Sequence, residues 1–429
     1  MVTFDSLRAD HCSYMGYERI TTPNLDEMAQ KGVNFKNTLS PASRTNPSMA
    51  ATFTGEPMVF REQVSNPDIS SQHLERHGTI AESLSEKGYT TCAFNPNAYA
   101  SRYYGFEKGF DEFEDFFFSE DKYQTIFEKH LSDSDIFGTL RNIRNFVRRE
   151  EVFRTWQSYI DDLKHWADKQ GEPFFLWIFS LETHFPYLTP REYREHSNIF
   201  DQYYYNWLSN KLIDDLDPDI SESTWANIID IYDDSIIFAD ALLGELRERL
   251  ADFDPIFVVF GDHGESFGEH GLYGHFYPDV YEENLHVPLV VYNSDDPSST
   301  YEESFSLVDL PDIVNTLADT GSISIENHND ESWSLATDYD GRSDRKVTAI
   351  KSGRWKYIVT RDDNGSIDQE LYDLETDPDE QLNLYTDEKS TSEAPYEVLE
   401  VLEQRHQSHE EEIINIRSYV SSQIKDGEL

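Results

Sequence analysis

Basic residues and cysteines are scarce in this chain of 429 residues. Its 35 lysines and arginines face 83 aspartates and glutamates, which gives a formal net charge of −48. Because a strongly negative protein repels polyanions, this balance argues against a nucleic-acid partner. The two cysteines, Cys12 and Cys92, are too few for a disulfide framework or a thiolate metal cluster. We expect both simply to pack in the core.

Long apolar segments are also missing. The longest, Pro173–Leu181 and Pro255–Phe260, are far shorter than the about 20 residues that a membrane-spanning helix needs. The chain does not open with a basic segment followed by an apolar one, so a signal peptide is not indicated. We therefore expect a soluble, cytoplasmic protein without a transmembrane segment.

The acidic residues are spread along the chain rather than gathered in one tail. Because 38% of the residues are hydrophobic and 14% are aromatic, the composition is that of a folded protein with a large core. A surface of this acidity suits concentrated salt, where the Debye length falls to about 3 Å at molar ionic strength. We therefore expect a halophilic origin.

Helical and strand-like segments alternate through most of the chain. A helix is expected between the cap residue Thr22 and the stop at Gly32, and short β-rich runs include Gly88–Phe94. This alternation predicts an α/β fold whose mainly parallel central sheet is flanked by helices. The apolar run Pro255–Phe260 ends in Gly-Asp-His-Gly, at the end of a parallel strand where ligands bind in such sheets.

Two units are expected. Residues 1–325 would form the catalytic α/β domain, with a helical insertion at about 115–170. Residues 326–429 would form a small C-terminal unit with a polar linker at 327–344, an antiparallel sheet and a terminal helix. Only four residues precede Asp5, so we expect the natural chain to begin further upstream. In the sequence as it stands we expect a frayed first strand and a weakly held Asp5.

Three distant segments end in residue types that bind metals or attack esters. They contain Asp5, the pair Asp262 and His263, and the loop that carries Thr45. Carboxylates with one imidazole suit Mg²⁺, Mn²⁺, Ca²⁺ or Zn²⁺. A divalent ion beside Thr45 would lower the pKa of its hydroxyl and turn a weak nucleophile into a useful one.

The order of these motifs resembles the sulfatase family of the alkaline phosphatase superfamily. The motifs are Asp5–His11 (DSLRADH), Thr45-x-Pro-Ser, His184–Tyr187 (HFPY), Gly261–Glu265 (GDHGE) and Gly268–Val291. The likeness covers nearly the whole chain and is poorest at about 115–170. It implies an alkaline-phosphatase-like fold with a small C-terminal antiparallel sheet plus helix.

The resemblance also implies roles for individual residues. Asp5, Asp262 and His263 match ligands of one divalent metal ion (Ca, Mg, Mn or Zn), with Thr45 as both ligand and nucleophile. His184 and His275 match positions that contact the anion or protonate the leaving group. The substrate-binding candidates are Arg44, which adjoins Thr45, together with Asn95 and Asn97, which stand where many sulfatases have a lysine.

Thr45 departs from the family pattern. Sulfatases carry a cysteine or serine here, in C/S-x-P-S-R, and convert it to formylglycine; this chain has Thr45, and Met49 replaces the arginine. Threonine cannot become formylglycine by that route. Thr45 instead resembles the nucleophile of superfamily relatives that cleave phosphodiesters or transfer phospho-alcohol groups.

Charge indicates the substrate class. Two-metal phosphatases add a second metal set, but Ser180 stands where its Asp would lie, four residues before His184. One divalent cation balanced by two carboxylates suits monoanions, such as phosphodiesters, phosphonate monoesters or sulfate esters. We therefore predict a metal-dependent hydrolase of sulfate or phosphate-type esters. The alternatives are a transferase of phospho-alcohol or sulfate groups to glycans or lipids, and a non-catalytic anion-binding member of the family.

Overall fold

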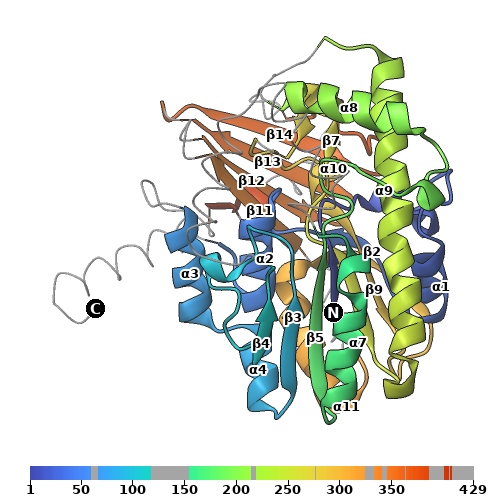
Figure 1. The fold of residues 1–429 in the computed structure, drawn as a ribbon. Coiled ribbons are helices and arrows are strands. Elements are labelled where there is room, and N and C mark those ends of the chain that lie inside the picture. Colours follow the sequence, from blue (N-terminus) through green and yellow to red (C-terminus); the bar gives the residue numbers. More distant parts are fainter. Residues whose placement is uncertain are drawn as a thin grey trace.

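The computed structural model describes residues 1–58, 66–116, 154–213, 219–275, 277–323, 333–340, 345–362, 364–385, 401–404 and 406–407. Its centre is an eight-stranded sheet in the order β10-β2-β9-β6-β1-β5-β3-β4. The strands are β1 (Val2–Phe4), β2 (Val33–Leu39), β3 (Thr90–Phe94), β4 (Glu112–Glu114), β5 (Phe174–Ser180), β6 (Phe257–Gly261), β9 (His286–Tyr292) and β10 (Ser299–Ser306). Only β9 runs antiparallel to its neighbours, so the predicted mainly parallel sheet is confirmed (Figure 1).

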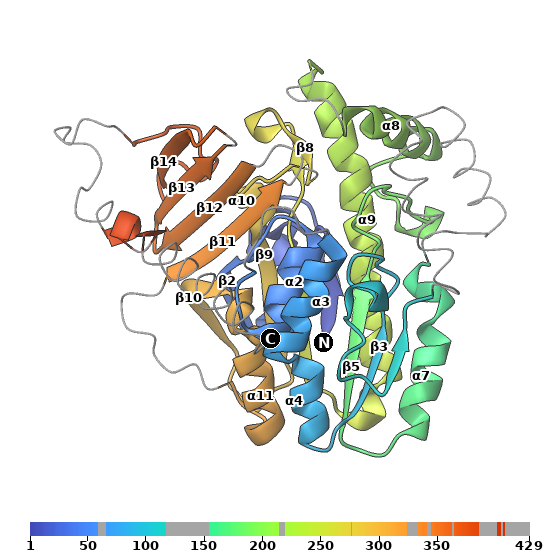
Figure 2. The ribbon, with the colours of Figure 1, turned by 90° about the vertical axis from the view of Figure 1, so that its left-hand side faces the viewer.

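Helices cover both faces of this sheet. The helices are α1 (Pro23–Lys31), α2 (Thr45–Thr54), α3 (Asn66–His77), α4 (Ile80–Glu86), α7 (Ile160–Lys169), α8 (Ile199–Leu212), α9 (Glu222–Arg249), α10 (Glu282–Leu285) and α11 (Leu310–Thr320). Apolar residues of α1, α7 and α9 share one buried cluster with the sheet. Those of α2, α4 and α11 share a second cluster on the opposite face, and Figure 2 looks onto the side of the molecule that carries α2 and α4. The alternating pattern thus gives a layered core on each side of the sheet.

The short first strand lies at the centre of the sheet. Its residues Val2–Phe4 pair in parallel with β5 on one side and with β6 on the other. Asp5, the next residue, donates its backbone N–H to the carbonyl of Ser180 over 3.0 Å. The expectation of a frayed strand and a weakly held Asp5 was therefore wrong, because pairing on both sides fixes even three residues.

A second, four-stranded antiparallel sheet packs beside the first, as predicted. Its strands are β11 (Trp333–Asp340), β12 (Arg345–Ser352), β13 (Trp355–Arg361) and β14 (Ile367–Asp373). The polar linker expected at 327–344 was wrong over 333–340, where β11 lies, and its remaining residues lie outside the described ones. The polar residues of this segment misled the prediction, since most of β11 is buried against the rest of the molecule.

A buried ion network fastens the second sheet to the main domain. Lys356 of β13 is fully buried and pairs with Glu282 of α10 over 3.0 Å and with Glu380 over 2.9 Å. Lys351 of β12 reaches the other oxygen of Glu282 over 2.6 Å. A buried charge is tolerated only when it is paired in this way, so the role of Lys356 is structural.

Two further expectations lie partly outside the described residues. Most of the helical insertion expected at about 115–170 falls in 117–153, and of the rest α7 is helical. Most of the terminal helix also lies outside them, although 401–404 and 406–407 are helical.

Cys12 and Cys92 are free and buried, as expected. Among the described residues no helix is both long enough and apolar enough to cross a membrane. The two small strands β7 (Ser266–Phe267) and β8 (Tyr273–Gly274) form a hairpin near the carboxyl end of β6.

Candidate active site

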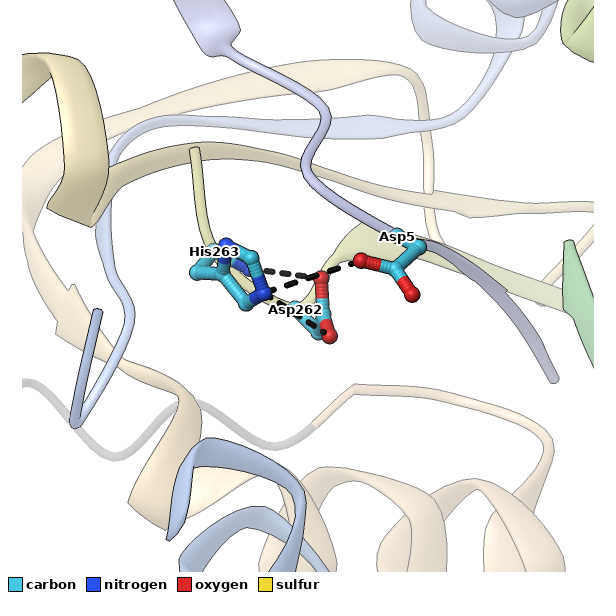
Figure 3. Close-up of side chains that lie close together, drawn as sticks. All are labelled: Asp5, Asp262 and His263. Atoms are coloured by element: carbon cyan, nitrogen blue, oxygen red, sulfur yellow. Dashed lines mark hydrogen bonds and ion pairs between the residues drawn. The ribbon is translucent and has the colours of Figure 1, made fainter. Parts of the chain in front are cut away.

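Two carboxylates and an imidazole meet where β1 and β6 end. Phe4 pairs with Gly261 in the sheet, so the next residues, Asp5 and Asp262, lie side by side and His263 follows. All three side chains are fully buried. One potential ligand atom from each lies within 4.8 Å of the others, and Figure 3 shows the three groups facing one another. The carboxyl end of the parallel sheet thus gathers a possible metal-binding cluster, as the sequence predicted.

Main-chain contacts fix the direction of these ligand atoms. Oδ1 of Asp262 accepts hydrogen bonds from the backbone N–H groups of Ser6, over 3.0 Å, and His263, over 2.8 Å. Its Oδ2 has no hydrogen-bond partner among the described residues. Nδ1 of His263 donates to the carbonyl of Gly264 over 2.8 Å, so the Nε2 lone pair faces Asp5 and Asp262 at 3.6 Å from each. An orphaned carboxylate oxygen and an unprotonated imine nitrogen are the donors that a divalent cation requires.

The electrostatics of the cluster also favour a cation. Burial raises the pKa of Asp262 to about 7, and burial together with the nearby charge of Asp262 raises the pKa of Asp5. Burial lowers the pKa of His263 to about 4, which keeps the ring neutral and able to act as a ligand. Two buried carboxylates in one site are costly without a compensating positive charge. The residues present therefore fit a divalent metal ion.

Thr45 lies against this cluster at the start of α2. Its Oγ1 is 3.1 Å from Nε2 of His263. The hydroxyls of Ser40 and Ser48, on either side of Thr45, each donate to the carbonyl of Asp262 over 2.6 Å. The chain on both sides of Thr45 is thereby fastened to a metal-ligand candidate. The N-terminus of α2 also brings a partial positive charge to the site, which suits an anionic substrate.

Two more histidines line the same site. The ring of His275 lies 4.5 Å from that of His263 and 5.1 Å from that of His184. Nδ1 of His184 donates to the carbonyl of Phe185, and Nδ1 of His275 donates to Oε1 of Glu265 over 2.9 Å. Each ring is therefore oriented through its Nδ1. Burial and the nearby His184 lower the pKa of His275 to about 3.

The three substrate-binding candidates have different surroundings. Nδ2 of Asn97 donates to Oδ2 of Asp5 over 2.5 Å, so Asn97 contacts the cluster directly. Asn95 lies one step further out, because its side chain contacts the backbone of Ala100 and Asn97. Arg44 forms an ion pair with Asp338 of β11.

Sequence reasoning assigned no role to Glu265 or Asp338. Glu265 lies inside the Gly261–Glu265 motif. Its position two residues after His263 was the signal that could have indicated a role in the site. Asp338 was placed in the expected linker, so nothing in the sequence connected it with Thr45. The structure brings it to Arg44 through the packing of the second sheet against the loop before Thr45.

A central parallel sheet with a buried metal-ligand cluster and a hydroxyl nucleophile candidate at its carboxyl edge defines a class of metal-dependent ester-cleaving enzymes. The family model named Sulfatase matches residues 1–321. An arylsulfatase of Clostridium perfringens is 24% identical over 459 residues, which cover 91% of this chain and 90% of that protein. A phosphoethanolamine transferase of Escherichia coli O157:H7 is 23% identical over 309 residues, covering 70% of this chain and 47% of that protein.

Solved structures show the same fold. The phosphonate monoester hydrolase of Agrobacterium radiobacter matches with a TM-score of 0.66 and 18% identity, over 97% of this chain and 95% of that one. The expected alkaline-phosphatase-like fold is thus confirmed. The chain belongs to the sulfatase family and is an ester hydrolase of the alkaline phosphatase superfamily. Members of this family are metal-dependent, in agreement with the cluster of Asp5, Asp262 and His263.

Proposed function

We propose that this enzyme hydrolyses monoanionic esters, phosphodiesters foremost, with Thr45 as the nucleophile. The observation that carries the proposal is the position of Thr45 Oγ1, 3.1 Å from His263 Nε2 in the buried cluster. Threonine lacks the chemistry of a formylglycine hydrate, which expels sulfate from a gem-diol. A phosphothreonine, in contrast, is resolved when water attacks its phosphorus.

One divalent ion, bound by Asp5, Asp262 and His263, would lower the pKa of the Thr45 hydroxyl and offset negative charge on the ester. Thr45 itself would be its fourth protein ligand. The oxygen donors favour Mg²⁺, Mn²⁺ or Ca²⁺, whereas the imidazole also admits Zn²⁺. Asn97 holds Asp5 in place through its 2.5 Å hydrogen bond.

In the first step the deprotonated Thr45 oxygen forms a bond to phosphorus and the bond to the leaving oxygen breaks. The Thr45 proton passes to solvent. His184, which is half-buried, would give the leaving alcohol its proton. His275 is more deeply buried, is held by Glu265 and would contact the anion. Water then attacks phosphorus and releases Thr45.

A transferase remains the second candidate. The relative from Escherichia coli O157:H7 is a phosphoethanolamine transferase, and its match covers 70% of this chain. Such an enzyme would use the same first step and replace water by an acceptor alcohol on a glycan or lipid. Product analysis with and without an added alcohol separates the two candidates.

The test compares the wild type with Thr45→Ala and Thr45→Ser in high salt, with Mn²⁺, Mg²⁺, Ca²⁺ or Zn²⁺ supplied in turn. Each protein is assayed on an aryl phosphodiester, an aryl phosphate monoester and an aryl sulfate. We expect diester cleavage that falls by about a thousandfold or more in Thr45→Ala and is partly kept in Thr45→Ser. Sulfate release that survives Thr45→Ala would overturn the mechanism in favour of attack by water.

A further inference from the structure

An ion pair connects the residue before the nucleophile with the C-terminal sheet. Nε of Arg44 donates to both carboxylate oxygens of Asp338 over 3.1 Å, and Nη2 donates to Oδ1 of Asp338 and to the carbonyl of Tyr339. The side chain of Asp338 is 0% exposed and that of Arg44 is 26% exposed. A guanidinium held by both oxygens of a buried carboxylate has a fixed orientation.

The same carboxylate also holds the loop before Thr45. The hydroxyl of Ser43 donates to Oδ2 of Asp338 over 2.6 Å, and the backbone N–H of Thr337 donates to the carbonyl of Pro41 over 2.9 Å. Strand β11 therefore contacts the chain at three positions just before Thr45. The active site is completed by a strand more than 290 residues further along the sequence.

The balance of charge gives this contact a chemical consequence. Asp5 and Asp262 together balance one divalent cation, so a charge on Arg44 would decide whether the site has a surplus positive charge. We propose that Asp338 is a specificity-determining residue, which cancels the charge of Arg44 beside Thr45 and so makes the site favour monoanionic over dianionic esters. This inference rests on the proposed function. It explains the preference of the enzyme for monoanionic esters by a residue of the second sheet.

The alternative is that Asp338 only anchors the loop. The two roles of Asp338 predict different changes in anion binding. If Asp338 only anchors the loop, its loss weakens the binding of every anion alike. Loss of a negative charge, in contrast, strengthens the binding of a dianion more than that of a monoanion. The ratio of two binding constants therefore distinguishes them.

The experiment measures binding of methyl phosphate, a dianion in mildly alkaline buffer, and of dimethyl phosphate, a monoanion, to the metal-loaded protein by calorimetry. For Asp338→Asn we expect the ratio of dianion to monoanion affinity to rise by about tenfold. The double variant Arg44→Gln/Asp338→Asn removes both charges and should return the ratio to the wild-type value. Ser43→Ala, which loosens the loop without a change of charge, should leave the ratio unchanged.

A ratio that is the same in Asp338→Asn as in the wild type would overturn the inference. If Asp338→Asn does not fold, Arg44→Gln gives the reciprocal test: it leaves Asp338 unbalanced, and the ratio should fall by about tenfold. Because binding needs no turnover, the experiment can refute the role of Asp338 without refuting the proposed reaction, and the reverse. A wild type that cleaves no diester while the ratio still shifts would refute only the proposed reaction.

Discussion

Glu265 and His275 form a buried carboxylate–imidazole pair, with His275 Nδ1 2.9 Å from Glu265 Oε1. The hydroxyl of Tyr187 donates to the other oxygen, Oε2, over 3.0 Å. Glu265 is therefore held on both sides and sets the orientation of the His275 ring. A carboxylate in this place fixes which ring nitrogen carries the proton.

The first prediction concerns this pair. Glu265→Gln keeps the size of the side chain but removes its charge, and we expect kcat/KM to fall by about tenfold to a hundredfold. Tyr187→Phe is the matched control, because it removes a hydrogen bond to Glu265 and leaves the charge; its effect should be smaller. Steady-state kinetics and thermal unfolding of both variants provide the measurement. Equal losses in both would show that the charge of Glu265 has no part in the reaction.

The second prediction concerns the metal. Asp262→Asn removes an ionised ligand whose Oδ2 lacks a hydrogen-bond partner among the described residues. We expect divalent-metal affinity to fall by about a hundredfold or more, measured by calorimetry on protein stripped with chelator. Asp240→Asn is the control: Asp240 is also buried, but it accepts hydrogen bonds from the backbone of Asn24 and Leu25 at the start of α1. That variant should lose stability and keep its metal affinity.

The third prediction is a pH dependence of the metal-free protein. Asp262 has a pKa of about 7 in the fold, raised by burial from its ordinary value of 3.8. Between these values the folded chain binds more protons than the unfolded chain, so the free energy of unfolding falls as pH rises. The fall reaches about 4 kcal/mol at most near pH 7 and then levels off.

Denaturant titrations in chelator at several pH values between about 5 and 8 measure this effect. The Asp262→Asn variant should show a weaker slope, although Glu265, whose pKa burial raises to about 7, still contributes to it. Saturating divalent metal should remove the Asp262 part of the slope, because the bound carboxylate stays ionised. The prediction fails if wild type and variant show the same slope in chelator.

The fourth prediction concerns Gly264, the residue after His263. A Cβ added there would lie 1.9 Å from the backbone carbonyl oxygen of Glu283. We expect Gly264→Ala to lower the free energy of unfolding by about 3 kcal/mol and to weaken metal binding, because His263 must shift with the backbone. Gly171 has open space around the corresponding position, so Gly171→Ala should change stability by less than about 0.5 kcal/mol. Denaturant unfolding of both variants tests the contrast.

Much of the fold could be predicted from local patterns. The helix between Thr22 and Gly32 and the buried strand within Pro255–Phe260 follow from capping residues and apolar runs, which act over a few neighbours. Strand β11 could not be predicted in this way, because its polar residues resemble those of a linker until the second sheet buries them. Tertiary burial overrode the local preference there. The halophilic origin and the cytoplasmic location stay predictions.

The sequence by itself determined the chemistry available to this protein: the residue types of Asp5, Thr45, Asp262 and His263, and their order at strand and helix ends. Only the tertiary structure decided which groups act on one another. It joined Glu265 to His275 and brought Asp338 to Arg44 across nearly 300 residues of chain. The reason is physical: a local pattern specifies an element, whereas the contacts between distant side chains depend on how sheets and helices pack together.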